Sequence, residues 1–341
     1  MNTNNTALNL LTISILLFAL LFTLMPAISS AEELQVYSSR NASYLTPLFN
    51  EYSHETGISV GYVVASAEEL IKRLEVEDEQ NVADILLTTG PVNLWRASQK
   101  GLLQPVNSKR LLRTVPKHLR SPEHEWFAFS LRAQAIAYDP NSISTESLND
   151  YADLAKPEWK GKLCLRTSNS EYAQSLVGSL SYHHGDEQAF EILKGWVRNL
   201  AQAPMIDDLA VLSAIDQKAC AVGIINSYYL PRHYATNKNS SIKLHWVKQN
   251  GSGVHADITG AGVLANAKNK ALAIDFLEWL LSRKAQALYA KISMEYPINA
   301  KVYPAYEMAK HGTFKEDKTD ISHLAMQQGK ASQLIRKSKY R

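Results

Sequence analysis

The chain has 341 residues, and its 36 Lys and Arg against 33 Asp and Glu give a formal net charge of +3. Apart from a short basic tail at residues 336–341 this charge is spread along the chain, so nucleic-acid binding is not indicated. The sequence shows neither an internal repeat nor a low-complexity segment, and its length is enough for two lobes that each bury a core.

Residues 1–31 are expected to lie outside the fold. Residues 8–28 are strongly apolar, and the small residues Ser29, Ser30 and Ala31 that follow fit a signal-peptidase site. We therefore expect export to the periplasm with cleavage of a signal peptide. Because the apolar stretch is long and no Lys or Arg precedes it, an uncleaved membrane anchor is the alternative.

Strand-like and helix-like segments alternate in the next part of the chain, which indicates a mostly parallel sheet with helices on both sides. Gly57 and Gly101 follow two of the helical segments, and Ser66 to Glu69 has the pattern of a capping box at the start of another. The expected strands are 34–37, 58–64 and 84–89, and the expected helices are 43–55, the segment after the capping box, and 92–100.

A long apolar run at 126–138, interrupted by Arg132, predicts a strand long enough to join two lobes. A second α/β set follows, with strands at 162–165 and 220–225 and helices from 171, at 186–200 and at 207–217, before a return strand at 258–265 and one helix at 271–290. This order predicts an α/β protein of two lobes with a ligand cleft between them. The first lobe is expected to contain 32–125 and 258–305, and the second lobe 126–257 with the tail helices of 306–341.

Only two cysteines are present, Cys164 and Cys220, and their spacing does not suggest a zinc site. Each lies in a short apolar, strand-like run. In an exported protein such a pair can form a disulfide across neighbouring strands, and the alternative is two buried thiols. We favour the disulfide.

Two adjacent tyrosines, Tyr228 and Tyr229, follow the second of these strands at its carboxyl end, which faces the ligand crevice in open α/β sheets. Phenolate oxygens suit a hard cation such as ferric iron, whereas the ordinary alternative is a packed pair with hydrogen-bonded hydroxyls. Neighbouring side chains on a strand point to opposite faces. Both can therefore bind one ion only if the chain leaves β geometry at Ser227 and enters a helix, which Pro231 in the first turn permits.

The chain also carries a series of short motifs in a fixed order: Val-Tyr-Ser-Ser-Arg at 36–40, Ala-Asp-Ile-Leu at 83–86, Gly-Leu-Leu-Gln-Pro-Val at 101–106, Leu-Arg-Thr-Ser-Asn-Ser-Glu-Tyr at 165–172, Asn-Ser-Tyr-Tyr at 226–229, Glu-Tyr-Pro-Ile-Asn at 295–299 and Gly-Thr-Phe-Lys-Glu-Asp at 312–317. This set resembles the periplasmic ferric-iron-binding proteins of bacterial iron ABC transporters. The resemblance implies a type II periplasmic binding protein fold and delivery of Fe³⁺ to an inner-membrane ABC permease. We expect a monomer without enzymatic activity, since no nucleophile and base pattern is found either.

By matching position, Tyr172, Tyr228 and Tyr229 correspond to the iron-ligating tyrosines of that family. The first lobe departs from the pattern. Many members carry histidine, or histidine and tyrosine, where this chain has Asn41 and Ala42, and many carry a glutamate where it has Thr89 or Gly90. Arg40 resembles the arginine that helps to hold a carbonate-like synergistic anion in three-tyrosine members.

Charge counting supports such an anion, because three phenolates neutralise a ferric ion and fill three of about six coordination positions. A bidentate carbonate fills two more, and the fork of Arg40 offsets part of its charge. Ser39 and Asn41 are further candidates for the anion. Arg132, Arg166 and Thr89 are candidates for the cleft, although each arginine fits a structural ion pair equally well.

Two other interpretations stay open. Loss of the first-lobe ligands is compatible with a protein of the same fold that binds an oxyanion, a polyamine or a carboxylate. An exported enzyme or an iron-sequestering accessory protein is the other possibility. Tyr44 is a candidate for the cleft edge. The histidines are scattered and are expected at the surface or as helix caps.

Overall fold

The computed structural model describes residues 33–341, so the predicted signal peptide lies outside the described residues. Leu34–Arg341 form one compact unit. Within this part of the chain, none of the helices combines the length and the apolar character that crossing a membrane requires.

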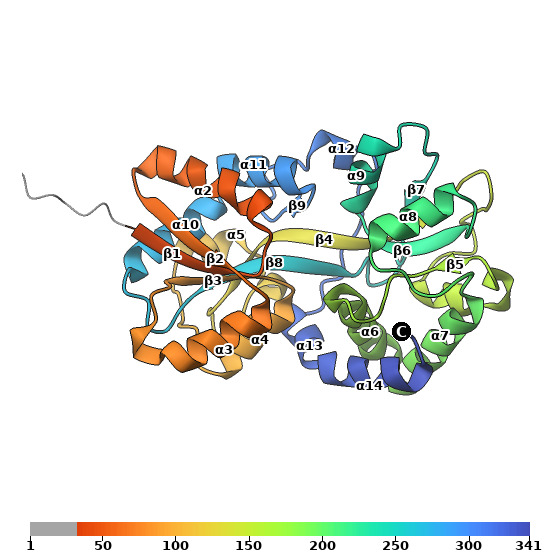
Figure 1. Cartoon of the computed structure of the whole chain (residues 1–341), viewed down its shortest axis with the longest axis horizontal. Coiled ribbons are helices and arrows are strands. Elements are labelled where there is room, and N and C mark those ends of the chain that lie inside the picture. The colour runs from red at the N-terminus through yellow and green to blue at the C-terminus, as the bar shows by residue number, and fades with distance from the viewer. Residues whose placement is uncertain (1–32) are drawn as a thin grey trace, which may run out of the picture. The chain divides into compact units, whose positions relative to one another are not determined.

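The elements can be followed in Figure 1. The strands are β1 (Glu33–Ser38), β2 (Ser59–Val64), β3 (Ile85–Thr89), β4 (Phe127–Tyr138), β5 (Leu163–Cys164), β6 (Val222–Asn226), β7 (Lys243–His245), β8 (Ala256–Val263) and β9 (Tyr296–Pro297). The α-helices are α2 (Ala42–Thr56), α3 (Ala67–Glu77), α4 (Pro91–Gln99), α5 (Lys109–Thr114), α6 (Glu171–His184), α7 (Asp186–Asn199), α8 (Asp208–Asp216), α9 (Tyr229–Thr236), α10 (Lys270–Leu280), α11 (Arg283–Ser293), α12 (Tyr306–Ala309), α13 (Ile321–Met326) and α14 (Gln328–Ser338). Short 3₁₀ helices are η2 (Asp78–Gln80), η3 (Lys117–Leu119), η4 (Tyr151–Ala155) and η5 (Pro157–Trp159).

The strands of residues 33–341 form one sheet in the order β2-β1-β3-β8-β4-β6-β5, with β7 and β9 also paired to β4. β1 and β3 are parallel, as are β5 and β6, but β8 is antiparallel to β3 and β4, and β4 is antiparallel to β6. The expectation of a mostly parallel sheet is therefore wrong. Figure 1 shows β4 and β8 side by side. One strand leads out of the first part of the sheet and the other leads back, so they must run in opposite directions.

Buried apolar side chains form separate clusters along this sheet. The first cluster includes Phe49 of α2 and Phe276 of α10, and we call the surrounding part the first lobe. Two further clusters, one containing Trp196 and the other Leu230, define the second lobe. Strand β4 contributes 127–129 and 131 to the first cluster and 136 and 137 to the others, so it passes between the two cores. The exact residue boundaries of the lobes stay a prediction.

Local signals placed most elements correctly. Gly57 ends α2 in the left-handed conformation, with φ of 75°, and the capping box of Ser66 and Glu69 is present at the start of α3. The single helix expected at 271–290 is wrong, because the chain forms α10 and α11 there. Ser282 caps α11 by accepting a hydrogen bond from the Ala285 amide at 3.1 Å, and its extended backbone interrupts the helix while the apolar spacing continues across the break.

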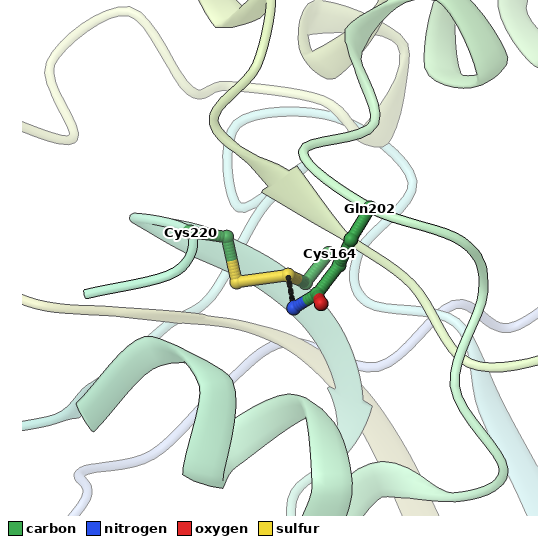
Figure 2. The surroundings of a disulfide bond; sticks show 3 residues. All are labelled: Cys164, Gln202 and Cys220. Atoms are coloured by element: carbon green, nitrogen blue, oxygen red, sulfur yellow. Dashed lines mark hydrogen bonds between the residues drawn. A yellow bond between two sulfur atoms is a disulfide. The ribbon is translucent and has the colours of Figure 1, made fainter. Parts of the chain in front are cut away.

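The two cysteines form the expected disulfide (Figure 2). Cys164 is the last residue of β5, Cys220 lies just before β6, and both side chains are buried. The Gln202 side-chain amide donates a hydrogen bond to the Cys164 sulfur at 3.7 Å. Because β5 has only two residues, this covalent link adds to a short parallel pairing with β6.

Replacing both cysteines with alanine is expected to lower the free energy of unfolding by about 2–4 kcal/mol, because the bond closes a loop between residues 56 positions apart. Urea unfolding of the variant, followed by circular dichroism, measures the change. Wild type unfolded in the presence of a reductant serves as the control and should lose a similar amount. An unchanged free energy of unfolding in both samples would contradict a stabilising role.

Candidate metal centre

The three candidate tyrosines lie at the starts of the helices that follow two paired strands. Strands β5 and β6 are parallel, so the segments that follow them leave the sheet at the same edge. Tyr172 is the second residue of α6, and its amide donates to the capping hydroxyl of Ser170 at 3.2 Å. Tyr228 has helical dihedral angles and Tyr229 begins α9. The predicted departure from β geometry at Ser227 is confirmed, and it allows adjacent tyrosines to face one centre.

The Tyr228 and Tyr229 rings lie together, with centroids 4.4 Å apart and an angle of 30° between their planes. Only 2% of Tyr228 is exposed. Burial, followed by the neighbouring Tyr172 and Tyr229 phenols, raises the pKa of Tyr228 well above its ordinary value of 10. Burial also raises the pKa of Tyr229. Both hydroxyls therefore keep their protons at neutral pH unless a cation displaces them.

Two arginines contact Tyr172. Arg132, fully buried in β4, donates to the Tyr172 hydroxyl at 2.9 Å and to the carbonyl of Ile258. Burial lowers the pKa of Arg132, but the charges of Tyr172 and Glu295 raise it by more, so the guanidinium keeps its charge. Arg166 lies over the Tyr172 ring, 5.3 Å from its centroid. Across residues 33–341, no carboxylate lies within ion-pair distance of Arg132.

Arg166, by contrast, is paired with Asp208 at 3.1 Å. Burial raises the pKa of Asp208, which opposes its ionisation. However, the carboxylate accepts from Arg166 and from both the amide and the side chain of Asn226, and these donors favour the ionised form. Arg166 is therefore balanced by its own partner.

Arg232 is a further member of this centre that sequence reasoning missed. Its guanidinium lies 4.4 Å from the Tyr228 ring centroid and 5.5 Å from that of Tyr229, and it donates to the Ser293 carbonyl at 2.8 Å. No ion-pair partner approaches Arg232 in the described part of the chain. The sequence did carry a signal for Arg232. It follows Tyr228 by four positions and Tyr229 by three, and side chains at these spacings share one face of a helix.

The predicted anion residue Arg40 faces this centre from the first lobe. Burial lowers the pKa of its guanidinium, whereas Glu295 and, to a smaller extent, the phenols of Tyr228 and Tyr172 raise it. However, Arg40 forms a buried ion pair with Glu295, which also accepts from the hydroxyls of Ser130 and Thr259. Glu295 opens one of the motifs noted in the sequence, yet its role was not foreseen. The positive charge of Arg40 is thus already balanced.

The other first-lobe candidates lie at the edge of the centre or outside it. Ser39 accepts a hydrogen bond from the Thr89 amide at 3.2 Å, which joins the ends of β1 and β3. Asn41 is exposed, and its side-chain oxygen accepts from the Ser43 amide at 2.8 Å as the cap of α2. An anion-binding role for Asn41 or Ser39 stays a prediction, as does a cleft role for Thr89.

Histidines and carboxylates do not offer another metal site in the described residues. No group of three or more His, Cys, Asp or Glu side chains within 33–341 is placed to hold a metal ion. The expectation that the histidines are superficial is wrong for His233 and His255, which are 2% and 1% exposed. The Nε2 atom of His233 contacts the Asp216 carboxylate at 2.6 Å, so this nitrogen is already used in a contact within the second lobe. Phenol oxygens are therefore the candidate metal ligands.

Two of the three candidate tyrosines are not fully buried. Tyr172 and Tyr229 are partly exposed, and Tyr172 lines a small pocket together with Gly90 and Glu171. Asn93 donates to the Thr89 carbonyl at 3.0 Å and to Glu171 at 3.1 Å, so the first lobe contacts α6 beside this pocket.

Comparison with known proteins identifies relatives of similar length. Residues 80–318 match the family model described as bacterial extracellular solute-binding protein. The chain is 36% identical over 299 residues to "Iron uptake protein A1" of Synechocystis sp., which covers 86% of this chain and 83% of that protein. It is 34% identical to "Iron uptake protein A2" of the same organism, with 94% of each covered.

Solved structures agree with this result. The structure described as "Trichodesmium (IdiA) (FutA) in complex with iron and citrate ligands" is 36% identical, with a TM-score of 0.85 over 91% of this chain and all of that one. The ferric binding protein from Campylobacter jejuni is 32% identical, with a TM-score of 0.82 over 90% of this chain and 100% of that one. The predicted two-lobed type II periplasmic binding protein fold is confirmed.

Proposed function

The chain belongs to the family of bacterial extracellular solute-binding proteins, and from that membership we propose that it captures ferric iron and delivers it to an ABC importer. Its proposed ligands are the phenolates of Tyr172, Tyr228 and Tyr229. The observation that carries the proposal is the gathering of these phenols at one sheet edge, in a described chain that offers no His, Cys or carboxylate metal cluster. Phenolate oxygen is a hard donor that matches a hard trivalent cation.

The charges around the tyrosines support a bound dianion beside the metal. Three phenolates neutralise Fe³⁺, while Glu295 balances Arg40 and Asp208 balances Arg166. Arg132 and Arg232 form no ion pair among the described residues, so their positive charges are available to an anion. Carbonate balances them and fills two of about six coordination positions. We propose that these two arginines, with Arg40 at the edge, hold the anion; citrate is the competing choice because a relative was solved with iron and citrate.

The proposal extends to location and partners. The apolar segment before the described residues fits a signal peptide, and the curated relatives include periplasmic proteins. We propose that the mature protein works as a monomer in the periplasm and hands its iron to the permease of an inner-membrane ABC importer.

A second candidate function follows from the same two arginines. Without iron, Arg132 and Arg232 would attract a free oxyanion or small carboxylate into a site whose phenols are protonated. Under this alternative the anion is the transported ligand and iron is not bound.

A titration of the purified, iron-free protein with ferric nitrilotriacetate separates the two functions. We expect a visible phenolate-to-iron charge-transfer band that saturates at one iron per chain and strengthens when bicarbonate is added. Parallel samples with citrate compare the two anions. A protein that stays colourless with iron but binds bicarbonate or citrate by calorimetry would favour the second candidate.

A further inference from the structure

Tyr44 is contacted by a guanidinium from each lobe. It lies in the first turn of α2 and packs against the first-lobe core. The guanidinium carbon of Arg40, in the same lobe, lies 4.4 Å from the Tyr44 ring centroid. That of Arg232, from α9 in the second lobe, lies 5.0 Å from the same centroid. The contact between Tyr44 and Arg232 therefore crosses from one lobe to the other.

Arg232 connects this contact to the candidate metal ligands. It lies over the Tyr228 ring at 4.4 Å and donates to the Ser293 carbonyl at the end of α11. Helix α11 contributes Tyr289 to the first-lobe core. Arg232 thus contacts the proposed ligand Tyr228 in its own lobe. In the opposite lobe it contacts the Ser293 carbonyl and the Tyr44 ring.

The first lobe offers contacts here rather than metal bonds. Its carboxylate beside the centre, Glu295, is already paired with Arg40, and Asn41 caps a helix at the surface. An aromatic face attracts guanidinium groups, and this attraction is stronger where water is excluded. Arg40 and Arg232 both meet the Tyr44 ring in a partly buried position.

We propose that Tyr44 is the positioning residue through which the first lobe holds Arg232 against the tyrosine centre and so slows iron release. The inference rests on the proposed function. Iron bound to Tyr228 fixes that ring, Arg232 lies on it, and Tyr44 joins Arg232 to the first lobe. In this proposal the aromatic face of Tyr44 holds Arg232, and the Tyr44 hydroxyl is not an iron ligand.

The test compares Tyr44→Phe, which keeps the aromatic face, with Tyr44→Leu, which removes it. Iron release to excess chelator is followed by decay of the charge-transfer band. We expect Tyr44→Phe to release iron within twofold of the wild-type rate and Tyr44→Leu about tenfold faster, the size expected for losing one cation–π contact. The band should keep its wavelength in both variants. Tyr303→Leu, at a side chain that is 90% exposed, is the matched control and should behave like wild type.

Wild-type release from Tyr44→Leu would overturn the inference, as would equally fast release from Tyr44→Phe, which would assign the effect to the hydroxyl. If Tyr44→Leu does not fold, Tyr44→Trp and Arg232→Gln decide: the first should resemble wild type and the second should release iron about tenfold faster. The opposite pattern rejects the role. Absence of the band in wild type would instead reject the proposed function itself, so the two failures are distinguishable.

Discussion

Tyr228→Phe combined with Tyr229→Phe is expected to abolish iron binding while the protein stays folded. The substitutions remove two proposed ligand oxygens and keep both rings, which pack with centroids 4.4 Å apart. Loss of affinity should exceed about 100-fold, since even partners that only orient a ligand commonly contribute 10–100-fold. The free energy of unfolding should change by about 1 kcal/mol or less, the usual contribution of a hydrogen bond. Competition with a chelator and thermal unfolding measure the two quantities.

Tyr303→Phe is the control for this experiment, because Tyr303 is 90% exposed and lies outside the tyrosine centre. It removes the same atom and should leave the charge-transfer band, the iron affinity and the stability unchanged. Wild-type affinity in the double variant would reject the ligand assignment. A double variant that does not fold would be replaced by the two single variants, each of which should weaken binding.

Iron affinity is expected to rise steeply with pH between 6 and 8. Burial raises the pKa of Tyr228 and Tyr229 above the ordinary value of 10, so both carry protons throughout this range. Iron must displace these protons, and each released proton makes the affinity about tenfold higher per pH unit. The two protons of Tyr228 and Tyr229 alone give about 100-fold per unit, and acidification releases the metal. Equilibrium competition at pH 6, 7 and 8, corrected for protonation of the chelator, measures the slope.

The Tyr228→Phe and Tyr229→Phe double variant provides the matched comparison, since any residual iron binding should lose the slope that these two phenols contribute. A wild-type affinity that does not change with pH after correction would mean that the bound form retains both protons. That result would contradict phenolate ligation by this pair.

Local signals in the sequence predicted the strand and the turn that carry Tyr228 and Tyr229. Contacts between residues far apart in the sequence could not be predicted in this way. The strand that ends before Tyr228 and the break at Ser227 are local features, and both are present. Glu295 pairs with Arg40 across 255 positions, a partnership that the fold creates and that local pattern cannot reveal. Helix spacing could have predicted that Arg232 lies on the same face as Tyr228 and Tyr229. Its contacts with the first lobe depend on the fold and could not be predicted.

The same distinction explains the errors in the fold. The apolar spacing of 271–290 predicted one helix, because buried positions continue on both sides of Ser282. The spacing gives no sign that Ser282 caps a new helix. Strand direction depends on which strands become neighbours, and the alternation of strands and helices does not report that β4 and β8 run antiparallel between the lobes.

The most direct test is a crystal structure of the protein loaded with ferric iron, with the metal located by its anomalous scattering. We predict a single peak about 2 Å from the hydroxyl oxygens of Tyr172, Tyr228 and Tyr229, with an anion between the metal and Arg132 or Arg232. An iron peak away from these three oxygens, or hydroxyls that point apart around an empty centre, would contradict the account.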